Sequence, residues 1–305
     1  MSSPAPMSEA LRAFRRTPLP LVLVDDAGET RAILPLARGR FGPVTTLESP
    51  VLAGTPYGGP ACAVEDFPRA IAALPGLRSL VRFDYLKVHA PPHAPAPRSL
   101  PDGFESETGT TAVLSLRNSE QELWAGLKPT CRRKVQAARK AGLEVRTASV
   151  PDEIDEVMAW STQAYRRHRK KAAIPRTFFE NLWRELRDRS LRLFVADRAG
   201  RPVALTLVAW DRARLYSIAS HFDRGTRAPG ASNLVWWEAI RWGAEQGLEA
   251  FDMVGANVPS IAEFKLSFGG KRQQSFSLVW SDPLFRLANR ARGILSRLRA
   301  GEPSG

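Results

Sequence analysis

The chain has 305 residues, of which 44% are hydrophobic and 25% are charged. These proportions are those of a globular protein with about two domains, and they exclude collagen-like, coiled-coil and disordered chains. Lysine and arginine number 44 against 31 aspartate and glutamate residues, which leaves a net charge of +13. A charge of this size attracts polyanions such as nucleic acid, anionic lipid or phosphorylated small molecules. GC-rich coding would produce an arginine excess as well, so the charge alone establishes no partner.

Several protein classes are excluded by what the sequence lacks. No apolar run approaches the roughly 20 residues that cross a bilayer, and the first ten residues lack the basic-then-apolar order of a secretion signal. Cys62 and Cys131 form neither a disulfide framework nor a metal motif, and the four histidines lack metal-ligand spacing. No phosphate-binding Gly-x-x-x-x-Gly-Lys loop and no Gly-x-Ser-x-Gly nucleophile motif occurs. We therefore expect a cytoplasmic protein without a bound metal.

The first half of the chain is predicted to consist mainly of strands. Leu19–Asp25 and Thr30–Ala37 are apolar runs on either side of a polar turn, which is typical of a β-hairpin. Phe67–Leu74 has helical character and precedes a Pro-Gly pair that would end a helix. Arg78–Lys87 alternates in part and is predicted as a strand. Proline is frequent from Ala90 to Gly103, so this segment is expected to be extended surface chain.

The second half has clearer element boundaries. Ser119 and Glu122 have the spacing of a capping box that begins a helix, and a second helix from Cys131 is expected to end before Gly142. In chain order there follow a strand at 143–147, helices from 151 and 177, strands at 191–197, 202–210 and 214–220, a helix at 232–246, a strand at 250–254, a helix at 259–268 and a strand at 274–280. A three-stranded meander followed by a strand–helix–strand unit predicts a mixed sheet covered on both faces. Ligands favour the crevice where such a sheet changes from antiparallel to parallel pairing.

Several short motifs occur in a defined order along this half. They are Leu123–Lys128, Arg132–Gly142, Asn233–Ile240, Phe251–Gly255, and Phe264-Lys265 with Phe268-Gly-Gly270. Together with the order of elements, they resemble the FemAB-like or BioF2-like branch of the GNAT acyltransferase superfamily. The first half is similar to the same family more loosely, through Leu34–Ala37 and Tyr57–Pro60. The resemblance implies an α/β (α+β) fold of two tandem GNAT-like halves, each a mixed, mostly antiparallel sheet flanked by helices.

This resemblance also implies an organisation and a reaction. We expect a degenerate N-terminal half at 1–112, a C-terminal transferase half at 113–283 and a basic amphipathic tail at 284–305. The reaction implied is transfer of an acyl or aminoacyl group to a small or glycan-linked amine by direct attack, without a metal. Acyl-CoA and aminoacyl-tRNA are the rival donors, and a role in cell-envelope or polysaccharide biosynthesis is expected.

A candidate donor-phosphate loop lies between a predicted strand and a predicted helix. The segment Arg227-Ala-Pro-Gly230-Ala231-Ser232 is similar to a degenerate GNAT pyrophosphate loop. A glycine permits close backbone approach, and the free amides and dipole at a helix N-terminus favour an anion. We therefore assign Arg227, Gly230, Ala231 and Ser232 to donor binding. The alternative is an ordinary loop in which Ser232 only caps the helix.

Three polar side chains are candidates for catalysis. Lys265 follows Phe264, a pair that the resemblance links to the aminoacyl donor, and a lysine there can stabilise an oxyanion or hold a phosphate. Asp252 ends a predicted strand beside the crevice and could accept or orient the proton of the attacking amine. His221 ends the third meander strand and could act as a base. For each, a structural role is the alternative: a solvated lysine, a loop-capping aspartate and a packed histidine.

Substrate contacts and the basic surfaces complete the prediction. Tyr216, Phe264 and Asn233 are assigned to substrate binding, although strand parity alone leaves open whether Tyr216 faces the cleft or the core. The basic clusters at 132–140 and 166–171 and the amphipathic tail could bind phosphates or an anionic membrane at the inner face. They are equally explained as solvated faces and, for the tail, as a segment docked on the protein. The alternative function is therefore a non-catalytic polyanion-binding protein on a degenerate GNAT scaffold.

Overall fold

A computed structural model of the chain describes residues 16–49, 57–148, 153–167, 175–223, 225–226, 228–283 and 285–286. These residues form two compact units, within the segments Gly109–Gln274 (unit 1) and, for unit 2, Arg15–Val51, Tyr57–Thr108 and Ser275–Gly305. The chain was expected to divide between 112 and 113, close to the start of unit 1, whereas 275–283 lie in unit 2 instead of the C-terminal half. No helix in the described part of the chain combines the length and apolar composition needed to cross a membrane.

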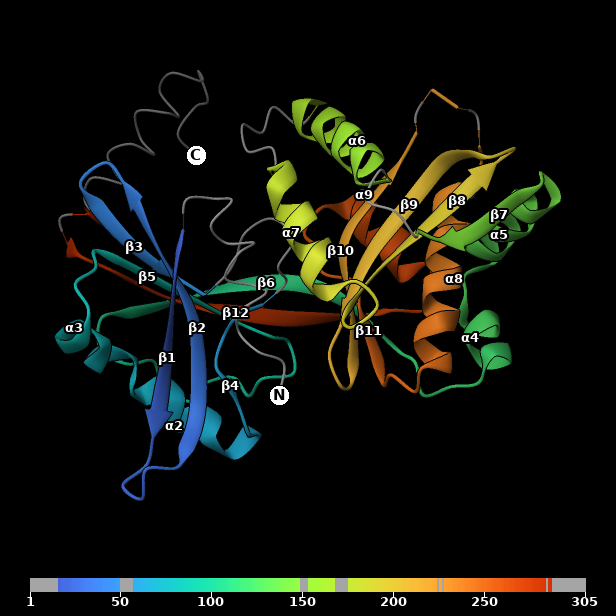
Figure 1. Cartoon of the computed structure of the whole chain (residues 1–305). Coiled ribbons are helices and arrows are strands. Elements are labelled where there is room, and N and C mark those ends of the chain that lie inside the picture. Colours follow the sequence, from blue (N-terminus) through green and yellow to red (C-terminus); the bar gives the residue numbers. More distant parts are fainter. Residues whose placement is uncertain are drawn as a thin grey trace, which may run out of the picture. The chain divides into compact units, whose positions relative to one another are not determined.

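Unit 1 contains a mixed sheet in the order β12-β6-β11-β10-β9-β8-β7 (Figure 1). Its strands are β6 (Phe104–Ser115), β7 (Leu143–Thr147), β8 (Leu191–Arg198), β9 (Arg201–Trp210), β10 (Arg214–Phe222), β11 (Ala250–Asp252) and β12 (Lys271–Ser281). The three-stranded meander β8-β9-β10 is antiparallel, as predicted, and β10 and β11 pair in parallel. Strands β6 and β12 have residues in both units.

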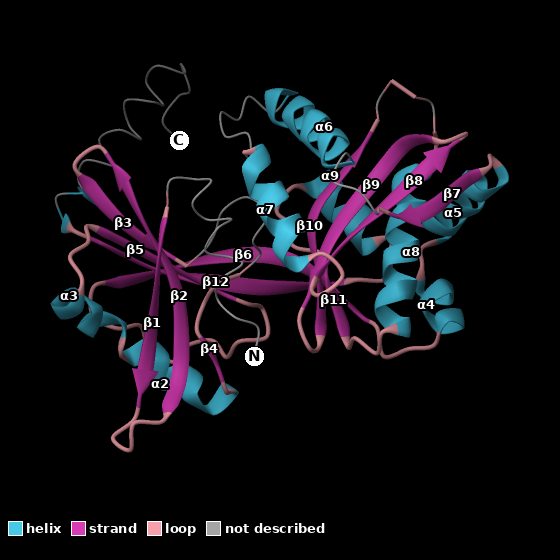
Figure 2. Cartoon of the chain, viewed as in Figure 1, coloured by secondary structure: helices cyan, strands magenta, loops and turns pink. Residues whose placement is uncertain are grey.

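Helices cover both faces of the unit 1 sheet (Figure 2). They are α4 (Glu120–Gly126), α5 (Pro129–Lys140), α6 (Glu153–Arg167), α7 (Arg176–Leu186), α8 (Ala231–Glu245) and α9 (Pro259–Leu266). Strand β9 shows why two layers form, because alternate side chains point to opposite faces. Leu205 and Leu207 belong to the apolar cluster that includes α6 and α7 residues, whereas Ala204 and Val208 belong to the cluster that includes α5 and α8.

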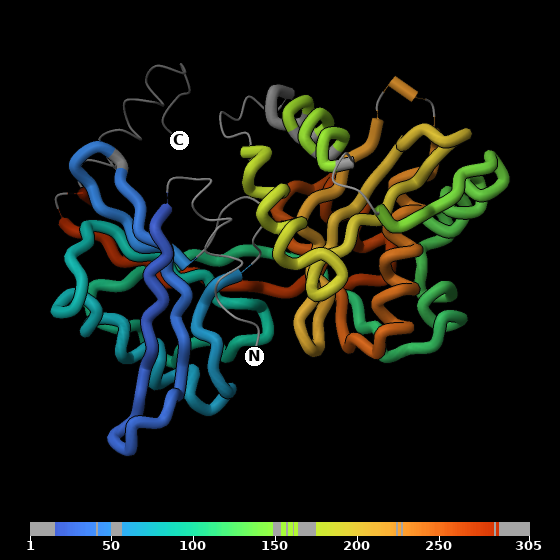
Figure 3. The backbone as a smooth tube through the Cα atoms, viewed as in Figure 1, coloured from blue at the N-terminus to red at the C-terminus, as the bar shows by residue number. Residues whose placement is uncertain are grey.

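The parallel strands β10 and β11 pair over only three residues each. Arg214, Leu215 and Tyr216 lie opposite Ala250, Phe251 and Asp252, after which β11 ends while β10 continues to Phe222. A β-bulge at Ile218 interrupts the register of β10 with β9 in this same stretch. Figure 3 follows the chain from β10 through α8 to β11. The part of β10 beyond Tyr216 therefore has no parallel partner from β11, which leaves the crevice that the sequence predicted at the switch in pairing.

Unit 2 contains strands paired in the order β1-β2-β3-β5-β12-β6, with β4 paired to β2. Its other elements are β1 (Thr17–Val24), β2 (Thr30–Phe41), β3 (Val44–Glu48), β4 (Ala61–Cys62), α2 (Phe67–Ala72), α3 (Leu77–Leu80) and β5 (Tyr85–Ala90), with short 3-10 turns at Val64–Asp66 and Leu74–Gly76. The predicted hairpin and helix are confirmed. The single strand predicted at 78–87 is wrong in its first part: residues 77–80 are helical because Leu74 and Leu77, three residues apart, both pack into the core. The predicted α/β class, with mixed, mostly antiparallel sheets flanked by helices, is confirmed.

Candidate functional site

Two adjoining pockets lie in unit 1 at the N-terminus of α8. The first, the loop pocket, has a volume of about 680 Å³ and is lined by Lys134, Val203, Phe222, Asp223, Thr226 and the segment from Ala228 to Asn233. The second, the strand pocket, has a volume of about 600 Å³ and lies where β10 and β11 diverge. Phe222, Ser232 and Asn233 line both pockets. These three residues therefore form a wall that the two pockets share.

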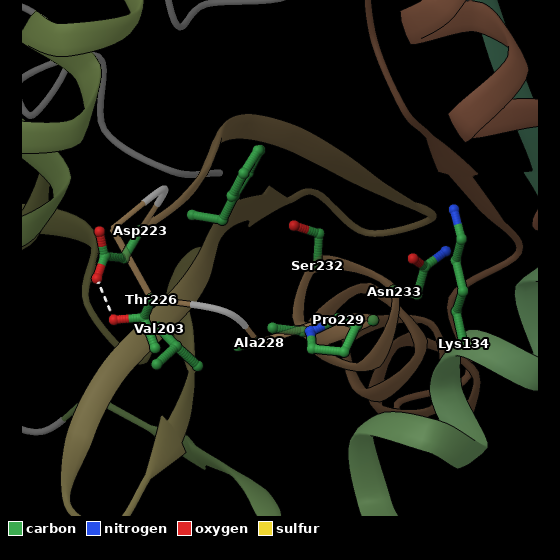
Figure 4. Close-up of a pocket in the computed structure, with 11 residues that line it drawn as sticks. Lys134, Val203, Asp223, Thr226, Ala228, Pro229, Ser232 and Asn233 are labelled. Carbon is green, nitrogen blue, oxygen red and sulfur yellow. Dashed lines mark hydrogen bonds between the residues drawn. The ribbon is translucent and has the colours of Figure 1, made fainter. Parts of the chain in front are cut away.

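The loop pocket contains the first turn of α8. This helix begins at Ala231 and its N-cap residue is Gly230, so the alternative in which Ser232 only caps the helix is wrong. Ser232 and Asn233 instead stand in the first turn, where backbone amides have no partner within the helix and the helix dipole is positive. Lys134 from α5 adds a side-chain ammonium to the same pocket (Figure 4). The helix end and this lysine together favour an anion.

Gly230 is required by packing as well as by conformation. Its φ is +83°, and a Cβ at this position would overlap the backbone carbonyl of Lys134. The glycine therefore allows α8 to begin directly against α5, which brings Lys134 to the loop pocket. The sequence assigned the glycine to close approach of a phosphate. In the structure Gly230 lines the loop pocket, and its lack of a Cβ is also required by the backbone of α5.

The opposite wall of the loop pocket carries a negative charge. The Asp223 carboxylate accepts hydrogen bonds from the Thr226 hydroxyl at 2.5 Å and from the Gly225 amide at 2.8 Å (Figure 4). The hydrogen bond from Thr226 lowers the pKa of Asp223, so this group stays ionised. An anion is accordingly favoured on the Lys134 side of the pocket and disfavoured beside Asp223. Arg227, predicted to bind the donor, lies outside the described residues.

The strand pocket is built from four segments. Strand β10 contributes Ser217–Ser220 and Phe222, and α8 contributes Trp236 together with Ser232 and Asn233. The turn after β11 contributes Met253–Gly255, and α9 contributes Ser260, Ile261, Phe264 and Lys265. Trp236 donates a hydrogen bond from Nε1 to the Ser220 hydroxyl at 2.6 Å. Its ring packs edge-on against Phe264, with 5.2 Å between centroids. These contacts fix the aromatic wall between α8 and α9.

Lys265 is held against the turn that follows β11. Its Nζ donates hydrogen bonds to the carbonyl oxygens of Val254 and Gly255, the latter at 2.7 Å. Burial lowers the pKa of Lys265 to about 8, while the negative charge of Asp252 acts in the opposite direction. The side chain is therefore mostly protonated at pH 7 and places a cation in the wall of the strand pocket.

Asp252 ends β11, just before the turn that Lys265 contacts, and it is not among the described residues that line either pocket. It is 1% exposed, and its Oδ1 accepts hydrogen bonds from the Thr111 hydroxyl at 2.5 Å and the Val254 amide at 2.9 Å. Val254 has a φ of +51°, which is unfavourable for a β-branched residue. Asp252 on one side and Lys265 on the other thus hold the turn in this strained conformation.

Of the remaining predicted residues, two line the strand pocket and two line neither pocket among the described residues. Asn233 and Phe264 line the strand pocket, and buried Asn233 also donates from Nδ2 to the Cys131 thiol at 3.4 Å. Tyr216 and His221 line neither pocket among the described residues. The Tyr216 hydroxyl donates to Asp211 at 2.9 Å, and burial, followed by the charge of Asp211, raises the Tyr216 pKa. Burial lowers the pKa of His221 to about 4, so its ring is neutral at pH 7.

Two residues of the basic cluster of α5 have polar partners within unit 1. Arg132 donates to the Ala125 carbonyl at 2.7 Å, and Arg139 forms an ion pair with Glu238 at 2.8 Å. Lys134 is the member that lines a pocket, which sequence reasoning did not single out from its neighbours. The cluster at 166–171 and the tail fall on residues that the structure does not describe at side-chain level, apart from Phe285 and Arg286. The described residues hold no group of three or more His, Cys, Asp or Glu side chains placed to bind a metal ion.

Comparison with known proteins identifies the domain that carries both pockets. Residues 127–266 match the family model described as an acetyltransferase (GNAT) domain. No curated protein matches the chain. The domain match covers most of unit 1, including every described residue of the strand pocket, and it agrees with the GNAT superfamily predicted for this part of the chain.

Solved structures confirm the fold over nearly the whole chain. The structure of FemX has a TM-score of 0.71 at 12% identity and covers 92% of each chain. The C-terminal domain of a putative lysylphosphatidylglycerol synthetase from Agrobacterium fabrum has a TM-score of 0.57 at 14% identity, covering 94% of this chain and 91% of that one. A tandem GNAT protein from the clavulanic acid biosynthesis pathway has a TM-score of 0.50 at 15% identity, covering 86% and 82%. The predicted architecture of two tandem GNAT-like halves is thereby confirmed.

Proposed function

Because residues 127–266 belong to the acetyltransferase (GNAT) family, within a tandem GNAT-like fold, we propose that this chain is an N-acyltransferase that moves an acyl group from acyl-CoA to a primary amine. The observation that supports acyl-CoA as the donor is that the two pockets adjoin and share three lining residues. One end offers an anion site at a helix N-terminus, and the other offers an apolar crevice with a single cation. This arrangement fits a ligand with a diphosphate at one end and a thioester at the other.

The donor diphosphate is placed against the first turn of α8. The amides near Ser232 and Asn233 point from a helix of 15 residues, whose dipole favours negative charge at this end. The Lys134 ammonium supplies a charge-assisted hydrogen bond. Asp223, ionised on the opposite wall, keeps the anion on the Lys134 side. The rest of the donor then passes Ser232 and Asn233, which line both pockets, into the strand pocket.

The proposed chemistry needs no covalent enzyme intermediate. The neutral amine attacks the thioester carbonyl carbon, forming the C–N bond and placing negative charge on the carbonyl oxygen. The protonated Lys265 donates a hydrogen bond to that oxygen and stabilises the charge as it develops. The C–S bond then breaks, the electron pair leaves with sulfur, and the proton lost by the amine passes through water to the departing thiolate.

Asp252 takes part in this proposal as a positioning residue. Its carboxylate is engaged by Thr111 and the Val254 amide, so it holds the turn whose carbonyls fix the Lys265 ammonium. His221 receives no proton-transfer role, because its ring lies outside the described pocket walls. Phe264 and Asn233 contribute the pocket wall, and Tyr216 supports β10 from outside the pockets.

Aminoacyl-tRNA is the rival donor. The net charge of +13 and the Phe264-Lys265 pair favour it. The acceptor is proposed to be a small or glycan-linked amine of the cell envelope or of polysaccharide biosynthesis. The fold likeness to a protein named for the membrane lipid lysylphosphatidylglycerol supports the cell-envelope setting. We place the protein in the cytoplasm, with contact of its basic tail to the inner membrane face as the accompanying proposal.

Calorimetric titration of the full chain tests the donor. CoA is expected to bind the wild type, and Lys134→Met is expected to weaken CoA about tenfold or more, since hydrogen bonds to charged groups contribute about 1.5–3 kcal/mol. Lys140→Met is the matched control, because this exposed lysine of the same helix lines neither pocket among the described residues. Binding of charged tRNA without CoA binding would overturn acyl-CoA as the donor. Binding of any polyanion alike, over a salt series, would support the non-catalytic alternative.

A further inference from the structure

The exposed large hydrophobic side chains of unit 1 gather at one place. In the described part of this unit they are Phe222, Val258 and Ile261, at 45%, 50% and 43% exposure. Phe222 and Ile261 line the strand pocket, and Val258 is the N-cap of α9, the helix that carries Ile261. Apolar side chains grouped at the mouth of a pocket are one of the features that mark ligand-binding grooves.

The interior of the strand pocket continues this apolar character. Ile218, Trp236, Met253 and Phe264 form much of its wall. The Ser220 hydroxyl accepts from Trp236 and is thereby partly satisfied. Among the described residues that line the pocket, Lys265 is the charged one. Its ammonium repels a cationic side chain and is placed to meet a carbonyl oxygen, so the pocket suits a neutral group with a carbonyl at one end.

The size of the strand pocket exceeds what a two-carbon group needs. An apolar cavity of about 150 Å³ holds a benzene molecule, and the strand pocket has a volume of about 600 Å³. An acetyl group is smaller than benzene, so an acetyl donor would leave Phe222 and Ile261 in contact with water. A longer apolar chain would remove these side chains from water, which is favourable in proportion to the area covered.

We propose that the strand pocket selects donors with an apolar acyl chain longer than acetyl, whose carbonyl lies at Lys265 and whose chain covers Phe222 and Ile261. This inference rests on the proposed function. The acyl group transferred is accordingly a neutral, fatty one. A cationic aminoacyl group such as lysyl is disfavoured by the ammonium in the wall.

The test is a chain-length series by calorimetry on the full chain. Free CoA, acetyl-CoA, hexanoyl-CoA and decanoyl-CoA are titrated under one set of conditions. Each fully buried methylene is worth about fourfold in affinity, so hexanoyl-CoA is expected to bind at least about tenfold more tightly than acetyl-CoA even with partial burial. Equal affinities across the series, with CoA itself bound, would overturn the chain preference and leave the donor proposal standing. No binding of any member would overturn both.

A variant pair assigns the preference to the pocket. Ile261→Ser is expected to reduce the affinity ratio of hexanoyl-CoA to acetyl-CoA by about threefold or more, because a serine covers less of the chain. Because Ile261 is 43% exposed, the variant is expected to remain folded, and a circular dichroism melt checks this. Leu80→Ser is the matched control: Leu80 lies in unit 2, is 73% exposed and should leave the ratio unchanged. An unchanged ratio in Ile261→Ser, or an equal drop in both variants, would contradict the proposal.

Discussion

Replacing Lys265 with methionine removes the ammonium from the strand pocket and keeps an unbranched side chain of similar length. Two effects follow from the structure. The developing oxyanion loses its donor, and the carbonyl oxygens of Val254 and Gly255 lose theirs. Loss of a single oxyanion donor typically lowers kcat by about 100- to 1,000-fold. We therefore expect a fall in kcat of this size with a folded protein.

The dependence of kcat on pH shows whether the protonated or the neutral form of Lys265 acts. With a pKa of about 8, Lys265 is protonated to about 90% at pH 7 and to about 10% at pH 9. If the ammonium form acts, kcat of the wild type falls about ninefold between these two values, and the Lys265→Met variant shows no such fall. The assay measures thiol release from hexanoyl-CoA with hydroxylamine, which is already a neutral nucleophile at pH 7.

The control for this prediction is Lys271→Met, which removes an exposed lysine at the start of β12. This variant should keep both the rate and the pH profile of the wild type. A wild-type rate that rises through pH 8 would show that the neutral amine of Lys265 acts, and would refute the oxyanion role. Retention of full activity in Lys265→Met would refute it as well.

Three further predictions concern the elements that position the site. Gly230→Ala should lower the free energy of unfolding, measured in urea, by more than about 2 kcal/mol, because the alanine would have a left-handed φ and its Cβ would overlap the α5 backbone. Gly247→Ala is the control: its φ is also left-handed but its Cβ meets open space, so it should lower the free energy of unfolding by about 1 kcal/mol. Thr111→Val should cost about 1–3 kcal/mol by leaving a buried oxygen of Asp252 with one donor fewer, and Thr111→Ser should restore most of it. His221 has a pKa of about 4 in the folded state and 6.5 in the unfolded state, so the unfolded chain binds the proton more readily and the free energy of unfolding falls as the pH drops from 6.5 to 4. His221→Gln should reduce this fall, and an unchanged dependence of the free energy of unfolding on pH would contradict the prediction.

Local signals predicted the elements of the second half well. The capping box is formed as expected, with the Ser119 amide donating to Glu122 at 2.9 Å and the Glu122 amide donating to the Ser119 hydroxyl. Gly142 takes a left-handed φ of +72° directly after α5. These features depend on a few neighbouring residues, so the sequence displays them. The first half was predicted less well because α3 and β5 follow each other within a partly alternating segment that resembles one strand.

The site was less predictable because its geometry depends on contacts between distant segments. Thr111, which is 141 positions from Asp252 in the sequence, donates a hydrogen bond to the Asp252 carboxylate. Because of this contact, we interpret Asp252 as a residue that holds the turn and not as a base. Lys134 reaches the loop pocket because Gly230 lets α8 start against α5, and neither residue shows this in the sequence. Lys265 was identified through the family resemblance, whereas its contact with the Val254 carbonyl could come only from the structure.

A crystal structure of the full chain with a non-hydrolysable analogue of hexanoyl-CoA tests the central claim most directly. The account predicts the diphosphate at the first turn of α8 beside Lys134 and the analogue's carbonyl oxygen within hydrogen-bonding distance of Lys265 Nζ. Clear density for the analogue at another place, or empty loop and strand pockets at saturating concentration, would contradict it.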